Sequence, residues 1–190
     1  MLKALTIEDN EKYLRQISKE VKFPDEELKQ NIEDIKEFCL NNSVFAMACV
    51  QLGIPKRIVY IKSTKCDANE NIDSEQILMI NPKILSKRGK TEYWEACASC
   101  LNNTALVERP YELLVEFQNE KGEKQTRLFE GFASTVISHE LDHLDGILHM
   151  DRAKELLVMT QSERKEFRKT HPYKIISKTC KFEYPSVKKF

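Results

Sequence analysis

Two histidines four positions apart, His139 and His143, constrain the fold of this chain more than any other feature. They lie in the segment SHELDHLDGILHM, which begins at Ser138. In an α-helix, side chains at positions i and i+4 point the same way about one turn apart, so both rings can reach one cation. Glu140 would then lie beside a water molecule bound to that cation. The spacing therefore predicts a metal-binding helix.

The same polar segment would also suit an exposed helix with ordinary surface histidines. Three of the four histidines in the chain fall within this one segment, however, and this clustering favours a metal site. The two histidines leave the remaining ligands open. The sequence offers three ways to complete the site, and all three use the same helix.

The first completion takes His149 as the third ligand, in the pattern HExxHxxGxxH, with Gly146 turning the chain. It would make the protein a zinc endoprotease with Glu140 as the base. Such enzymes also need a methionine turn downstream of the helix. The candidate is Met159, but its segment, KELLVMTQSERKEF, is predicted to be helical.

The other completions use the upstream cysteines Cys97 and Cys100. If both join the two histidines, the result is the closed, non-catalytic Cys2His2 site of a zinc finger. The connection between Cys100 and His139 includes at least two predicted strands and is far longer than a small finger uses. If Cys97 alone joins the histidines, a fourth position stays open for water, and the site can be catalytic.

The rest of the chain predicts an α+β fold. Thr6, with Asp9 three residues on, suggests a capped helix, and Pro24 opens a second helix. The second helix carries an apolar face formed by Leu28, Ile32, Ile35 and Cys39. We expect these N-terminal helices to be scaffold.

Four segments in the middle of the chain are rich in β-branched and apolar residues and predict strands. They are residues 57–62, 76–85, 111–118 and 125–129. Helical spacing returns from Phe132. The expected architecture is therefore a set of mixed, mostly antiparallel sheets packed around the central HExxH helix.

Composition limits the number of domains and the kinds of partner. The chain has five glycines and six prolines, with no repeat or linker, so we expect one domain over residues 1–190, whose tail, 171–190, could add a strand. Thirty basic side chains balance thirty acidic ones, which gives no support to a nucleic-acid or membrane-surface role.

Neither a membrane span nor a signal peptide is expected, because no apolar run approaches roughly 20 residues and the N-terminal segment is charged. The six cysteines are too few and too scattered for a disulfide scaffold. Free thiols in a reducing compartment, the cytoplasm, are therefore expected. The cysteines are Cys39, Cys49, Cys66, Cys97, Cys100 and Cys180.

Three segments, in this order along the chain, resemble the motifs of the peptide deformylase family. VFAMACVQ at 44–51 resembles its GxGxAAxQ, EACAS at 95–99 resembles its EGCLS, and SHELDHLDG at 138–146 resembles its HExxH helix. The resemblance extends over roughly residues 8 to 160. The last of the three segments is the most specific.

The resemblance implies one divalent metal ion per chain, held by Cys97, His139 and His143. The family's native ion is Fe(II), and Zn or Ni is often found after purification. It also implies that water is the fourth ligand and that Glu140 takes a proton from it. The substrate would be a newly made polypeptide, and the N-formyl group of its first methionine would leave as formate.

The resemblance also implies groups that touch the substrate. The side-chain amide of Gln51 and the backbone N–H of Ala98 would stabilise the oxyanion. An apolar pocket would hold the methionine side chain, although ordinary core packing is the alternative for its walls. The residues expected at the substrate are Phe45, Ala46, Ala96, Phe132, Thr135 and Val136.

Further residues are expected to support the site or only to pack. Glu95 and Arg109 can pair and brace the cysteine loop, or be plain surface charges. Cys49 and Cys100 are expected only to pack.

The chain departs from the family pattern where the substrate would lie. Val44, Ala46 and Ala96 replace glycines, and Ala98 replaces a leucine. Glycine lets the backbone approach a ligand closely or take angles that a Cβ forbids. We therefore expect weakened activity or a shifted substrate preference. A relative that only binds a metal or a peptide end is the non-enzymatic alternative. The expected partner is the nascent chain at the ribosome, and the sequence leaves the oligomeric state open.

Overall fold

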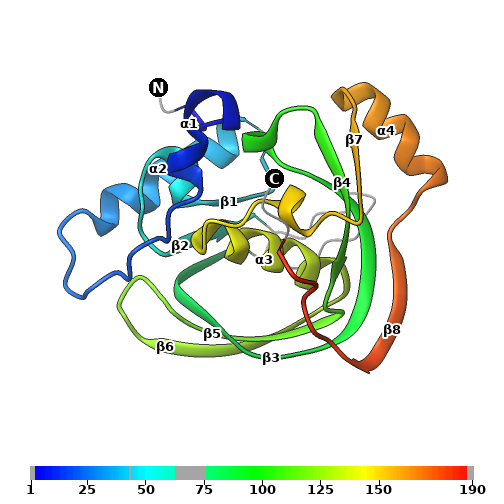
Figure 1. Ribbon diagram of the computed structural model, residues 1–190. Coiled ribbons are helices and arrows are strands. Elements are labelled where there is room, and N and C mark those ends of the chain that lie inside the picture. Colours follow the sequence, from blue (N-terminus) through cyan, green and yellow to red (C-terminus); the bar gives the residue numbers. More distant parts are fainter. Residues whose placement is uncertain (1–2, 43, 63–75, 188–190) are drawn as a thin grey trace.

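The protein is described by a computed structural model that covers residues 3–42, 44–62 and 76–187 (Figure 1). One residue discussed above, Cys66, lies outside these ranges. A central helix is surrounded by strongly curved sheet, two N-terminal helices pack at one side, and the C-terminal helix and strand run along the other (Figure 1). This arrangement confirms the predicted α+β class.

The helices begin close to where the sequence predicts them. α1 (Ile7–Leu14) starts at a capping box between Thr6 and Asp9, and α2 (Leu28–Asn41) buries all four residues of its predicted apolar face. α3 (Gly131–Leu144) carries the histidines. The remaining helical elements are α4 (Gln161–Thr170) and three short 3-10 turns, η1 (Cys49–Leu52), η2 (Ala98–Cys100) and η3 (His149–Arg152).

All pairings between the named strands are antiparallel. The sheet follows the order β1-β2-β3-β4-β7, while β5 and β8 also pair with β3, and β6 pairs with β5. The strands are β1 (Ala46–Ala48), β2 (Ile58–Ile61), β3 (Ile77–Ala96), β4 (Asn103–Arg109), β5 (Glu112–Gln118), β6 (Lys124–Glu130), β7 (Glu155–Val158) and β8 (Lys174–Lys181).

β3 is much longer than the predicted strand 76–85. It pairs with β2 and β5 in its first half, then with β8 and β4 in its second half. These ladders hold a charged stretch extended although its own side chains do not predict a strand, which is an effect of tertiary context. β3 curves around α3 (Figure 1). Its last residues, which include Glu95, therefore reach the central helix.

The segment around Met159 is not the continuous helix that the sequence predicts. Residues 155–158 form β7, which pairs with β4, and Met159 lies in the connection that follows. α4 begins only after Thr160, whose side chain accepts a hydrogen bond from the backbone N–H of Glu163 in a capping box. The prediction failed because pairing with β4 outweighs the helical spacing of the leucines.

α3 is the most buried helix of the fold. Its residues 133–135 and 137–144 are all buried. The apolar ones, Ile137, Leu141 and Leu144, pack into the main core with residues of β1, β2, β3, β5 and β6. The alternative of surface histidines on an exposed helix is therefore wrong. Within the described ranges, no helix is long and apolar enough to cross a membrane.

Candidate metal centre

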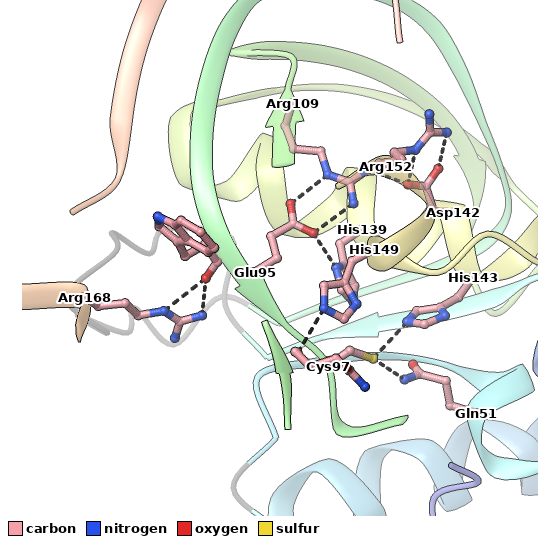
Figure 2. Close-up of polar contacts among 12 residues, drawn as sticks. Gln51, Glu95, Cys97, Arg109, His139, Asp142, His143, His149, Arg152 and Arg168 are labelled. Carbon is pink, nitrogen blue, oxygen red and sulfur yellow. Dashed lines mark hydrogen bonds and ion pairs between the residues drawn. The ribbon is translucent and has the colours of Figure 1, made fainter. Parts of the chain in front are cut away.

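Three buried side chains from two elements meet at the inner end of β3. Cys97 follows the last residue of β3, and His139 and His143 lie one turn apart on α3 (Figure 2). Their ligand atoms all lie within 4.8 Å of one another, and the Cys97 Sγ is 3.2 Å from His143 Nε2. Each of these residues is less than a tenth exposed. Thiolate and imidazole ligands suit Zn²⁺ or Fe(II), and three of them leave a coordination position open.

A buried carboxylate fixes the orientation of the first histidine. Glu95 Oε2 lies 2.8 Å from His139 Nδ1, and Arg109 donates two hydrogen bonds to the same carboxylate at 2.8 and 2.9 Å. Burial alone would raise the pKa of Glu95, but Arg109 outweighs it and lowers that pKa. An ionised carboxylate only accepts, so Nδ1 carries the proton and Nε2 keeps its lone pair for a metal.

The ionic contacts continue beyond Glu95. Arg109 also pairs with Asp142, which accepts two further hydrogen bonds from Arg152 at 2.6 and 2.7 Å (Figure 2). None of these three side chains is more than a tenth exposed. The result is a chain of alternating charges, Arg152–Asp142–Arg109–Glu95, that ends on His139. The predicted Glu95–Arg109 pair is present, and the surface-charge alternative for it is wrong.

The electrostatics of the cluster suit a cation. Burial lowers the pKa of the His139 ring, but the Cys97 sulfur and the Glu95 carboxylate outweigh burial and raise that pKa well above its usual range. The surroundings that favour positive charge on this ring would equally favour a metal ion at its Nε2. His143 Nδ1 is buried with no hydrogen-bond partner in the described structure.

Glu140 lies beside the candidate ligands and is also buried. Its Oε2 has no hydrogen-bond partner within the described part of the chain. Burial raises the pKa of this carboxyl group to about 8. A cation on the neighbouring ligands would lower the pKa again, since opposite charge favours the ionised form. A group balanced in this way can both accept and return a proton near neutral pH.

The two expected oxyanion donors belong to residues next to Cys97, one in space and one along the chain. Gln51, in η1, donates from Nε2 to Ser99 Oγ at 3.0 Å and to Cys97 Sγ at 3.4 Å. Its Oε1 accepts from the N–H of Ala48 at 2.9 Å, so the amide orientation is fixed. Ala98 is exposed at the start of η2, where the first N–H groups of a helix have no partner within it.

The expected pocket residues do not all have the same surroundings. Phe132 packs edge to face against Tyr93 and Tyr173, with ring centroids 5.1 and 5.4 Å apart. Thr135 is buried, with its hydroxyl 3.3 Å from that of Thr91. The remaining four, Phe45, Ala46, Ala96 and Val136, are half-buried, and Phe45 and Ala46 pack against the main core.

The glycine replacements introduce no backbone strain. Within the described ranges, Asn81 and Leu101 are the non-glycine residues with positive φ. Val44, Ala46 and Ala96 therefore adopt angles that any residue accepts. Their added side chains, methyl groups at Ala46 and Ala96 and an isopropyl group at Val44, can matter only through close approach of a ligand.

The zinc-protease and zinc-finger alternatives need His149 or Cys100 as a further metal ligand. Neither residue is in the group of ligand atoms. His149 is buried in η3, and its Nε2 lies 3.2 Å from the backbone oxygen of Asn103. Its ring centroid is 5.7 Å from that of His139, but neither of its nitrogens belongs to the ligand group. Cys100 is fully buried among apolar side chains, and Cys49 lies in a second apolar cluster, as expected of cysteines that pack.

Sequence reasoning missed Asp142, Arg152 and Ser99. Asp142 stands three residues after His139 and so shares a face of the helix with it. Because the predicted ligands on that face are buried, Asp142 could have been predicted to be buried and paired with a cation. Ser99 lies in EACAS, two residues after Cys97, and that motif could have signalled it. Arg152 carries no such local signal, because only the tertiary fold brings it to the site.

The amino-acid sequence is similar to that of a known protein family over most of its length. The sequence profile of the family described as polypeptide deformylase matches residues 3–158. The chain belongs to the peptide deformylase family. It is 35% identical to a peptide deformylase of Finegoldia magna over 149 residues, which cover 78% of this chain and 88% of that protein. It is 37% identical to peptide deformylase 2 of Clostridium acetobutylicum over 145 residues, covering 76% and 91%.

Solved peptide deformylases have the same fold. A probable peptide deformylase from Synechococcus phage S-SSM7 aligns with a TM-score of 0.70 at 35% identity and covers 80% of this chain and 99% of that one. A class I type b peptide deformylase from Acinetobacter baumannii, with Met-Ala-Ser bound, has a TM-score of 0.72 at 25% identity, covering 80% and 98%. Peptide deformylases are metal-dependent hydrolases of protein biosynthesis, so the chain is an enzyme of this class rather than a zinc endoprotease.

Proposed function

We propose that the chain removes the N-formyl group from the first methionine of new polypeptides with one divalent metal ion held by Cys97, His139 and His143. The observation that carries the assignment is the group of three ligand atoms within 4.8 Å of one another, formed by the cysteine of EACAS and the two histidines of HELDH. His139 Nε2 is available because Glu95 holds the proton on Nδ1.

The metal, when bound, would act as a Lewis acid and lower the pKa of water. Glu140 would accept the proton of the attacking water on its carboxylate. It would then give that proton to the amine nitrogen as the C–N bond breaks, which releases formate and a free N-terminus. The buried, unpartnered Oε2 of Glu140 supports this role.

The developing oxyanion would be stabilised by two donors fixed beside the sulfur. Gln51 would contribute the Nε2–H that lies toward Cys97, and Ala98 its backbone N–H. Both groups are positioned before the substrate binds, because Gln51 is held through its Oε1 and Ala98 by the turn of η2. Donors that are already in place stabilise a transition state strongly, and Gln51 would only have to move one N–H from the Cys97 sulfur to the oxyanion.

The substrate would lie along the strands that flank the metal ligands. Its methionine side chain would enter an apolar region formed by Phe132, Thr135 and Val136 of α3, with Phe45 opposite. Its backbone would pass Ala46 at the start of β1 and Ala96 at the end of β3. The half-buried state of Phe45, Ala46, Ala96 and Val136 supports this path, since a substrate-binding surface is only partly covered.

We further propose that Fe(II) is the native ion, with Zn or Ni able to replace it, and that residues 1–190 act as one domain. The ligand set of one thiolate and two imidazoles is compatible with each of these metals. The partner would be the formyl-methionyl nascent chain at the ribosome, in the cytoplasm. The five described cysteines are free thiols, which agrees with a reducing compartment.

Metal analysis of three cysteine and histidine variants tests the ligand assignment. We expect wild type to bind one Co(II) per chain and Cys97→Ser to lose it. His149→Ala and Cys100→Ser should keep the metal, because neither residue belongs to the ligand group. Loss of metal in His149→Ala with retention in Cys97→Ser would overturn the assignment.

A further inference from the structure

The chain continues well past the part that matches the family profile, which ends at residue 158. α4 and β8 run along the outside of the curved sheet, and the chain then turns back toward the region of α3 (Figure 1). β8 pairs with the second half of β3, between Arg88 and Glu92. This C-terminal segment, residues 161–187, contacts the supports of the metal cluster at two separate places.

The first contact is at the strand that carries the cysteine. Arg168, on α4, donates to the backbone oxygen of Trp94 from Nε at 3.1 Å and from Nη2 at 2.5 Å. Phe167 packs edge to face on the Trp94 ring, with centroids 5.1 Å apart, and the Arg168 guanidinium lies 4.6 Å from the ring centre of Tyr93. Trp94 directly precedes Glu95 and stands three residues before Cys97. α4 therefore adds side-chain hydrogen bonds to the backbone just ahead of Glu95 and Cys97, which also pairs with β4.

The second contact is at the outer end of the ionic chain. The ring of Tyr184 lies 4.0 Å from the guanidinium carbon of Arg152, and Lys87 Nζ is 4.7 Å from the same ring. Phe182, two residues earlier, is only 3% exposed and anchors this part of the chain. The ring therefore covers the guanidinium that clamps Asp142. A cation over an aromatic face is stabilised, and more so when water is excluded.

The ionic chain connects the Tyr184 ring to the metal ligand His139 through side chains only. Arg152 holds Asp142, Asp142 pairs with Arg109, and Arg109 holds Glu95. Glu95 in turn fixes the ring of His139. Each link is a charge-assisted hydrogen bond between buried groups, so its strength depends on the exclusion of water.

We propose that the C-terminal segment positions the metal ligands, with Tyr184 and Arg168 as positioning residues for His139 and Cys97. The proposal rests on the metal site of the proposed function. Neither residue touches substrate or metal. Tyr184 keeps water from the Arg152–Asp142 pair, and Arg168 holds the end of β3, so that the ligands keep their geometry before the metal arrives. Groups that hydrogen-bond a metal ligand directly commonly change metal affinity by about 10- to 100-fold, so for residues that act through such groups we expect the lower end of this range.

The test is Co(II) affinity, measured by competition with a chelator, together with the thiolate-to-cobalt absorption band. Tyr184→Leu keeps an apolar side chain but removes the aromatic face, and we expect it to weaken Co(II) binding roughly tenfold. Tyr184→Phe keeps the aromatic face and loses only the hydroxyl, which interacts with Ser138, so it should bind Co(II) more tightly than Tyr184→Leu. Arg168→Leu should weaken binding to a similar extent and shift the band, because the backbone ahead of Cys97 is released. Tyr111→Leu is the matched control, since Lys178 of β8 lies over the Tyr111 ring and, within the described residues, no contact joins Tyr111 to Arg152.

The outcomes separate this proposal from the function on which it rests. If wild type binds Co(II) with the thiolate band but Tyr184→Leu and Arg168→Leu bind it equally well, the positioning role is wrong and the metal site stands. The positioning role is also wrong if the control weakens binding as much as they do, or if Tyr184→Phe binds Co(II) no more tightly than Tyr184→Leu. If wild type itself gives no thiolate band, both proposals fall.

Discussion

Single residues at this site act through charge and hydrogen bonding inside a core that excludes water. The clearest case is Asp142, which lies between two arginines and belongs to neither the ligands nor the base. Removing one partner of a buried ion pair leaves an uncompensated charge, which costs more than the pair itself contributes. The free energy of unfolding should therefore depend strongly on the Asp142 carboxylate.

We expect Asp142→Asn to lower the free energy of unfolding by roughly 3 to 5 kcal/mol, because two buried guanidinium groups lose their common counter-charge. Urea unfolding measures this. Asp145→Asn is the control, since Asp145 is more than half exposed and pairs with Arg57 at the surface, where a pair is worth about 1 kcal/mol or less. Equal effects of the two changes would contradict the account.

The alanines at the glycine positions of the family give a second prediction at this scale. Ala46 and Ala96 have ordinary backbone angles, so only their methyl groups separate them from glycine. Ala46→Gly and Ala96→Gly are expected to raise kcat/KM for a formyl-methionyl peptide several-fold and to cost roughly 0.5 to 1 kcal/mol of stability. Steady-state kinetics and urea unfolding check both parts. Unchanged or lower kcat/KM would show that the methyl groups do not obstruct the substrate.

At the scale of elements, the sequence correctly predicts the helices that have a local pattern of apolar, capping or metal-binding residues. The histidine helix, the capping box of α1 and the apolar face of α2 are all local patterns, and the structure has them where expected. The second half of β3 and the whole of β7 depend on pairing with distant strands. No local pattern records such pairing, so the sequence predicts β3 too short and wrongly predicts a helix before Met159.

The junction between β3 and β8 can be tested at one glycine. Gly89 has φ +70°, and a Cβ there would lie 2.6 Å from Tyr111 Cβ and 2.7 Å from the backbone oxygen of Ser177. Gly53 has a similar φ of +80° but nothing within 4 Å. Gly53→Ala should therefore cost about 1 to 2 kcal/mol for the backbone angle alone. Gly89→Ala should cost clearly more, because β8 must also move away. Urea unfolding of both variants decides, and equal costs would mean that β8 is not packed closely here.

At the scale of the molecule, the metal and the fold should stabilise each other. Any ligand that binds only the folded state stabilises it, by about 2.7 kcal/mol at a concentration of 100 Kd. For a chain of this size, about 1 kcal/mol corresponds to roughly 2 to 4 °C in Tm, so a chelator should lower the Tm by roughly 5 to 10 °C. In Cys97→Ser, the chelator should have no effect. A Tm independent of chelator in wild type would contradict a bound ion at this site.

The metal ligands of the candidate site were predicted from two short motifs, and the Glu95–Arg109 pair was predicted with them, while the rest of the support was not. Cys97, His139 and His143 are recognisable because their chemistry restricts residue type and spacing. Arg152 and the C-terminal contacts act through surroundings that many sequences could supply, so no pattern marks them. The glycine replacements could be predicted only in part. The family motif shows that Val44, Ala46 and Ala96 replace glycines, but only the backbone angles show that these replacements cause no strain.

The central claim is that a metal-bound Cys97–His139–His143 site uses Glu140 to release formate. The most direct test measures formate from formyl-Met-Ala-Ser together with metal content, on anaerobically prepared protein loaded with Fe(II). We predict one metal per chain in both wild type and Glu140→Gln, with formate release reduced at least about 100-fold in the variant. Metal-loaded wild type that releases no formate, or a variant that keeps the wild-type rate, would contradict the claim.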